Sequence, residues 1–83
     1  MEKYKRNDKV IAMCNIDGNR IRKEFKGKVI RDTRSYVSVE WEKNILGHNC
    51  RDLDDNLSGK QGFCWNVPPT MIKKIEDQLE FEF

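Results

Sequence analysis

With 83 residues, of which 37% are apolar and 36% charged, the chain can form one small domain around a thin core. Its mean hydropathy is -0.83. No segment approaches the roughly 20 consecutive apolar residues of a membrane-spanning helix, which excludes that class. The net charge of +2 combines a basic segment 1–34, with eleven Lys/Arg against five Asp/Glu, and an acidic remainder, with five against nine. An anionic partner on one face is therefore allowed but not required.

The N-terminus reads MEKYKRNDK and is not followed by the apolar stretch of about 7–15 residues that a signal peptide contains. We therefore expect a cytoplasmic protein with no membrane partner. The three cysteines are an odd number in a chain without an export signal. This favours free thiols over a disulfide framework.

The first predicted strand is the apolar run at residues 10–14, where Val10, Ala12 and Cys14 share one face. Residues 17–19, Asp-Gly-Asn, favour a turn because Gly and Asn tolerate positive φ. Residues 20–26 alternate loosely between polar and apolar side chains. We expect them to return to the sheet as an extended hairpin arm.

Gly27 opens the second predicted strand, GKVIRD, and glycine is common where a strand bends at the corner of a barrel. After a short polar connection, residues 36–42 (YVSVEWE) alternate with period 2 and form the clearest strand of the chain. This alternation predicts that Trp41 lies in the core with two valines. Tyr36 and Ser38 are expected on the opposite, outward face.

A long polar segment, residues 43–62, separates these strands from the last two. Loops of this length inside a small domain are uncommon and are usually functional or mobile. Residues 63–67 (FCWNV) predict a fourth strand in which Trp65 shares a face with its apolar neighbours and is buried. Pro68-Pro69 ends that strand, and residues 71–75 can form a short closing strand. The acidic and aromatic tail, 76–83, can pair as an edge strand, form a helical turn or extend freely.

Five short strands, an arm after the first and a turn before the last predict an all-β, single-domain protein: a five-stranded, partly open barrel with one long loop and a short C-terminal tail. The segments GKVI, YVSVEWE and GFCWNVPP, with the closing run, resemble SH3-like small β-barrel proteins of bacteria and phages. The resemblance covers residues 8–75 and is strongest over VSVEWEKNILGHNC and GKQGFCWNVPPTMIKKI. It implies the fold, and it implies no particular activity or cofactor.

Cysteine and histidine residues allow two kinds of chemistry. Cys14, His48, Cys50 and Cys64 are a conceivable Cys3His zinc set, but the chain lacks the paired CxxC spacing typical of zinc sites. His48 and Cys50 lie two residues apart, as a base and a thiol nucleophile could, yet no third group is identified to orient the imidazole. The interpretation favoured is a non-enzymatic protein without a metal or other cofactor, in which Cys14 and Cys64 are strand positions.

Nucleic-acid binding is one candidate function. Small barrels bind nucleic acids through a basic groove combined with aromatic stacking. Here a basic cluster surrounds Phe25 in the arm and the strand that follows it. The residues of this arm cluster are Arg20, Arg22, Lys23, Lys26 and Lys28.

Protein recognition is the candidate that we favour from the sequence, because SH3-type barrels bind extended peptides between their arm and the loop joining the third and fourth strands. The acidic run Asp-Leu-Asp-Asp at 52–55 also allows a phage-type inhibitor that imitates a phosphate backbone and regulates a bacterial nucleic-acid-handling system. The predicted contact residues are Tyr36, His48, Asn49, Arg51, Asp52, Asp54 and Asp55.

Overall fold

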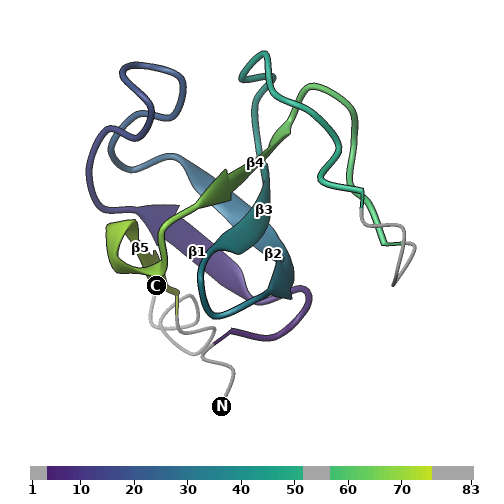
Figure 1. Ribbon diagram of the computed structural model, residues 1–83. Helices are drawn as coiled ribbons and strands as arrows, with labels where there is room; N and C mark the ends of the chain where they lie inside the picture. Colours follow the sequence, from purple (N-terminus) through teal and green to yellow (C-terminus); the bar gives the residue numbers. More distant parts are fainter. Residues whose placement is uncertain (1–3, 52–56, 76–83) are drawn as a thin grey trace, which may run out of the picture.

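The computed structural model describes residues 4–51 and 57–75, and within them the chain is all-β (Figure 1). Its five strands form one antiparallel sheet in the order β4-β3-β2-β1-β5, and a single 3-10 turn, η1 (Pro69–Met71), precedes the last strand. The strands are β1 (Lys9–Ala12), β2 (Lys26–Asp32), β3 (Val37–Trp41), β4 (Cys64–Val67) and β5 (Ile72–Lys74). All five predicted strands are confirmed, but β4 and β5 are the two edges of the sheet, which is not closed into a barrel.

One face of the sheet carries the main core. Directly paired residues of antiparallel strands point to the same side, so Val10, Gly27 and Trp41 form one row across β1, β2 and β3. Trp41 is 1% exposed and Tyr36 is 37% exposed, which confirms the predicted positions of both aromatic residues. Burying the alternate apolar side chains of each strand on this face is the main source of folding free energy.

Gly27 is required by this core and not only by a bend of the strand. A Cβ at this position would lie 2.7 Å from the Val39 side chain and 2.7 Å from the Glu40 carbonyl oxygen. It would also lie 3.1 Å from the Trp41 ring. The absence of a side chain on β2 therefore makes the space that the Trp41 indole fills.

A β-bulge in β2 changes which side chains reach the second face of the sheet. Val29 pairs with Val39, but the next pair is Arg31 with Ser38, so Ile30 is the extra residue of the bulge. The alternation therefore shifts after Val29, and both Ile30 and Arg31 become available to the second face.

This second face is covered where β2, β3 and β4 meet. Ile30, Cys50 and Cys64 are buried together, and Leu57 packs against them. Ser38, expected to face outward, is fully buried and donates to Asn66 Oδ1 at 2.6 Å. The prediction for Ser38 was wrong because the β3–β4 connection folds back over this face, which the alternation of β3 alone does not reveal.

Two further sequence predictions are corrected at strand ends. β1 stops at Ala12, and the Met13 amide donates to the Met71 carbonyl, so Cys14 lies outside the strand and is exposed. Trp65 is only partly buried, because β4 is an edge strand and leaves one side of the indole uncovered by a neighbouring strand.

The arm between β1 and β2 folds back on itself, as predicted. Ile16 and Ile21 pair through two backbone hydrogen bonds and are both buried in the main core. Asp17 and Gly18 adopt positive φ of 55° and 68° at the tip, where the sequence predicted a turn. The predicted tail, 76–83, and Asp52, Asp54 and Asp55 lie outside the described residues. No helix in the described part of the chain is long and apolar enough to cross a membrane.

Replacing Gly27 with alanine should destabilise the fold by about 1–3 kcal/mol, because the added methyl overlaps the Val39 side chain and the backbone of β3. Urea unfolding of the Gly27→Ala variant measures this loss. Lys28→Ala, an exposed position on the same strand, is the matched control and should change the free energy of unfolding by less than about 0.5 kcal/mol. Equal stability of the two variants would contradict the packing described for Trp41.

Candidate functional site

Arg31 attaches the β3–β4 loop to the second face of the sheet. Its guanidinium donates from Nη1 to the Cys50 carbonyl at 2.5 Å and from Nη2 to the Leu57 carbonyl at 2.7 Å. Nη1 also donates to Ser38 Oγ at 3.2 Å. The planar fork of an arginine thus satisfies carbonyl groups on both limbs of the loop, which would otherwise be desolvated without a donor.

Close backbone contacts hold the same loop against β4. His48 forms a two-way bridge with Cys64, and the Gly59 amide donates to the Asn49 carbonyl at 2.8 Å. A Cβ on Gly59 would lie 2.5 Å from the Cys64 sulfur. The described base of the loop is therefore part of the packed structure.

The two thiols beneath the loop are poor nucleophiles. Burial, followed by the nearby Cys64 sulfur, raises the pKa of Cys50 to about 12. Burial, followed by the Glu40 carboxylate, raises the pKa of Cys64 to about 11. Both thiols are thus protonated at neutral pH, and the thiolate is the reactive form of cysteine. His48 Nδ1 accepts a hydrogen bond from the Cys50 backbone amide at 2.9 Å, so this nitrogen holds the loop turn and does not face the thiol as a base.

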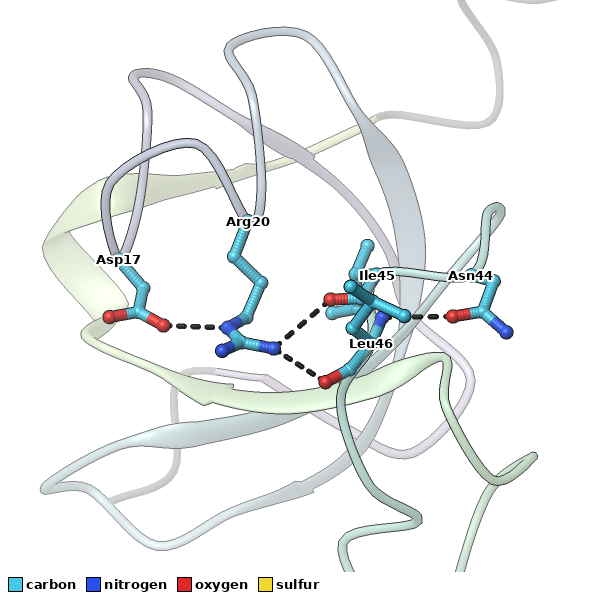
Figure 2. Close-up of polar contacts among 5 residues, drawn as sticks. All are labelled: Asp17, Arg20, Asn44, Ile45 and Leu46. Carbon is cyan, nitrogen blue, oxygen red and sulfur yellow. Dashed lines mark hydrogen bonds and ion pairs between the residues drawn. The ribbon is translucent and has the colours of Figure 1, made fainter.

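Arg20 connects the arm to the start of the β3–β4 loop (Figure 2). Its Nε donates to Asp17 Oδ2 at 2.6 Å, and its Nη1 donates to the carbonyl oxygens of Ile45 and Leu46 at 3.1 and 2.5 Å. Asn44 Oδ1 accepts a hydrogen bond from the Leu46 backbone amide at 2.8 Å. This bond fixes the turn from which the Ile45 and Leu46 carbonyls point to Arg20. The arm and the loop are thus held at a fixed separation by one guanidinium.

The same guanidinium lies over Trp65. Its central carbon is 4.3 Å from the indole centroid, and the His48 ring is 5.0 Å from the same indole at an angle of 38°. Cation–π contact with a partly exposed tryptophan contributes about 0.5–1 kcal/mol. One cluster is therefore formed at the base of the β3–β4 loop by Trp65, Arg20 and His48.

A groove lies between the arm and the loop. Its hollow has a volume of about 300 Å³. Leu46 at its rim is 84% exposed with a positive φ of 59°, and Ile45 beside it is buried. The Lys43 ammonium lies 4.9 Å from the Phe25 ring centroid and adds positive charge to the opposite wall. The residues that line the groove are Asn19, Arg20, Arg22, Phe25, Lys43, Asn44, Ile45 and Leu46.

Of the predicted protein-contact residues, the four that the structure describes are not gathered at one place. Tyr36 precedes the Val37–Val67 pair at one end of β3, whereas His48 bridges Cys64, which pairs with Glu40 near the other end. Asn49 Oδ1 accepts a hydrogen bond from the Arg51 backbone amide, and this bond holds a turn within the loop. Arg51 is exposed.

The predicted basic arm cluster is also divided. Arg20 is committed to the contacts with Asp17, the loop and Trp65. Arg22 and Lys23 are exposed on the arm. Lys26 and Lys28 belong to β2 and point to the second face of the sheet, in register with Ile11 and Lys9.

The conceivable zinc set is not assembled either. Cys14 is exposed on the arm, while Cys50 and Cys64 are buried beneath the β3–β4 loop. Across residues 4–51 and 57–75, no group of three or more His, Cys, Asp and Glu side chains is arranged to hold a metal ion.

Sequence reasoning missed Arg31 and most of the groove. Arg31 was read as one more charge in a strand, because the bulge that turns it toward the loop is a property of the pairing with β3. Leu46 had a usable signal, as a large apolar residue in an otherwise polar loop. Lys43 carried no such signal, since a single lysine after Glu42 is ordinary at the start of a polar loop.

Substituting Arg31 with methionine should destabilise the protein by about 1–3 kcal/mol for each carbonyl left buried without a donor. Urea unfolding gives the free energy. Arg31→Lys keeps the charge but cannot reach both limbs of the loop at once, so an intermediate loss is expected. A methionine variant as stable as the wild type would show that the loop does not depend on this guanidinium.

The buried thiols should make stability fall with rising pH above about 9. Below the ordinary thiol pKa near 9.0, the folded and the unfolded chain both keep these thiols protonated. The full stabilising contribution of the two buried thiols is therefore present. As pH rises toward 11–12, the thiols of the unfolded chain ionise first and the stabilisation is lost.

Urea midpoints measured between pH 8 and 11 test this in the wild type and in a Cys50→Ala/Cys64→Ala variant, which should show a shallower decline. Cys14→Ser is the control, because this exposed thiol should leave the pH profile of the wild type unchanged. Parallel profiles for the wild type and the double variant would rule out the contribution of the buried pair.

Comparison with known proteins adds no relative from which a role could be transferred. No family model, no curated protein and no solved structure matches this chain. Its function is therefore inferred from the groove, the buried thiols and the charged surfaces of the molecule alone.

Proposed function

We propose that the protein is a non-enzymatic recognition module of the SH3-like type, which binds an extended segment of a partner protein in the groove between its arm and its β3–β4 loop. The observation that carries the proposal is the hollow of about 300 Å³ with the 84% exposed Leu46 on its rim. Leu46 shares this hollow with Phe25 and Ile45, and apolar surface gathered at a concave place is typical of an interaction site.

Three features of the sheet support the SH3-like assignment. An arm follows β1, a 3-10 turn stands immediately before β5, and β5 returns to pair with β1. The arm and the turn before the last strand are two of the elements that the sequence predicted for such a fold. They also bring the arm and the β3–β4 loop to the same place, joined by Arg20.

The chemistry of the groove indicates the kind of segment it takes. Arg22 and Lys43 supply positive charge that is not used in an ion pair within the part of the chain that the structure describes. Phe25, Ile45 and Leu46 supply apolar surface between and beside them. A partner segment with alternating apolar and acidic side chains fits both, and the fixed separation of the walls lowers the entropy cost of binding.

The non-enzymatic part of the proposal is supported by the state of the buried thiols. Cys50 and Cys64 have raised pKa values and no solvent-accessible thiolate at neutral pH. The ring nitrogen of His48 nearest to Cys50 is used by a backbone amide. A narrower form of the proposal is a phage-type inhibitor, in which Asp52, Asp54 and Asp55 imitate a phosphate backbone. It is a special case of protein recognition.

Selection from a displayed library of random peptides tests the proposal. The wild type should enrich sequences that combine apolar and acidic residues. In 1H–15N spectra, a selected peptide should shift the amides of residues 19–25 and 43–46. A Leu46→Ser/Lys43→Glu variant should bind the same peptide at least tenfold more weakly, a loss of about 1.4 kcal/mol or more.

Tyr36→Ser is the matched control, because Tyr36 is also an exposed large side chain but lies at the far end of β3. Its affinity for the selected peptide should equal that of the wild type. Shifts centred on Tyr36, or equal binding by the groove variant, would place the recognition surface elsewhere.

A further inference from the structure

A second charged surface lies on the sheet itself, away from the groove. Lys9 pairs with Lys28, and Ile11 pairs with Lys26 on one side and with Lys73 on the other. Paired residues share a face, so these four lysines and Ile11 point to the same side of β1, β2 and β5. We name this set the lysine face. All four lysines are exposed, and Ile11 is half-buried among them.

The lysine face is built against ordinary pairing preferences. Like charges directly opposite each other on antiparallel strands destabilise a sheet, yet Lys9 stands opposite Lys28. Neighbouring strands are about 4.8 Å apart and alternate residues along a strand about 6.6 Å apart, so the backbone positions of Lys9, Lys26 and Lys28 lie within a Debye length of about 10 Å of one another. Within residues 4–51 and 57–75, no ion pair neutralises Lys26, Lys28 or Lys73.

The acidic side chains near this surface do not cancel its charge. Glu40 is in register with Lys28 but is half-buried, and its Oε1 would lie 2.9 Å from a Cβ built on Gly59, so its carboxylate is turned toward the β3–β4 loop. Glu42 follows β3, and its amide donates to the Lys26 carbonyl at the edge of the lysine face. Among residues 4–51 and 57–75, the four lysines of the face therefore outnumber these two carboxylates, and their summed charge is positive.

The lysine face is also open. The β3–β4 loop covers the second face of the sheet over Ile30, Cys50 and Cys64, at the β4 side. In Figure 1 that loop extends on the side of β4, away from β5. Within residues 4–51 and 57–75, the lysines on the part of the second face formed by β1, β2 and β5 are therefore exposed.

We propose that the lysine face binds the phosphate backbone of double-stranded nucleic acid without reading its sequence. Lysine ammonium groups act as point charges for phosphates, and this type of contact carries no base specificity. No aromatic side chain of β1, β2 or β5 points to this face, so it offers no platform for stacking unpaired bases. Ile11 is half-buried among the lysines and is the single apolar residue of the lysine face.

This inference is independent of the groove and of the peptide that the groove binds. It also moves the nucleic-acid surface away from the arm cluster. Arg20 is used internally, and only Lys26 and Lys28 of that cluster belong to the lysine face. Lys9 and Lys73 complete it, although they are distant in sequence from the arm.

Fluorescence anisotropy with two unrelated 20-base-pair DNA duplexes tests the proposal across a range of salt concentrations. Three or four phosphate contacts predict a slope of about -3 for log K against log salt, so a fourfold rise in salt should weaken binding roughly 60-fold. Both duplexes should bind equally, and more tightly than a single strand of the same length. A duplex affinity that is absent or independent of salt would overturn the proposal.

Two charge-matched variants locate the surface. K26Q/K28Q/K73Q should lose most of the salt-dependent binding, whereas R22Q/K23Q/K43Q removes the same charge from the arm and loop and should retain it. The reverse result would assign duplex binding to the arm. Stronger binding to phosphatidylserine vesicles than to duplex would overturn the proposal in favour of a lipid surface.

Folding and groove function serve as controls. The first variant should melt no lower than the wild type, because it relieves the repulsion between Lys9 and Lys28. If it does not fold, K28Q alone should still reduce the salt slope by about 1, and an unchanged slope would overturn the proposal. The lysine-face variant should bind the selected peptide like the wild type, so failure of either surface is seen separately.

Discussion

The structure depends on the one-residue bulge in β2. It leaves Val29 in the main core and lets both Ile30 and Arg31 serve the opposite face of the sheet. Ile30 then forms a small apolar cluster with two thiols, and Arg31 supplies donors to the carbonyl groups of the loop above it. Without the bulge, the strict alternation of β2 would turn Arg31 away from this face, and the β3–β4 loop would lose the hydrogen bonds that Arg31 donates to Cys50 and Leu57.

Covering this face explains how a chain with little apolar content folds. A single thin core of an 83-residue protein supplies limited stability. The second cluster adds burial with only two large apolar residues, Ile30 and Leu57, because two cysteines supply the rest of it. The same cover keeps Cys50 and Cys64 protonated, and it divides the remaining surface into a groove beside the loop and an open lysine face beyond it.

The strands could be predicted because their apolar residues recur with period 2 between clear turn residues, as in residues 36–42. The position of Trp41 followed from the same pattern. Ser38 could not be placed, because its burial depends on a loop that returns from more than ten residues away. The candidate site was predicted only as a region. The link between Arg20 and the carbonyls of Ile45 and Leu46 is tertiary, and cross-strand registers such as Lys9 with Lys28 are not encoded in local periodicity.

Native-state amide hydrogen exchange tests the central claim, that the base of the β3–β4 loop is part of the fold and not a free binding loop. The amides of His48, Cys64 and Gly59 donate to backbone carbonyls across the loop and β4. They should exchange with protection close to that of Val39 in the centre of the sheet, since both open only in a large unfolding event. Exchange of the His48 and Gly59 amides at rates typical of exposed loops, with Val39 still protected, would contradict the account.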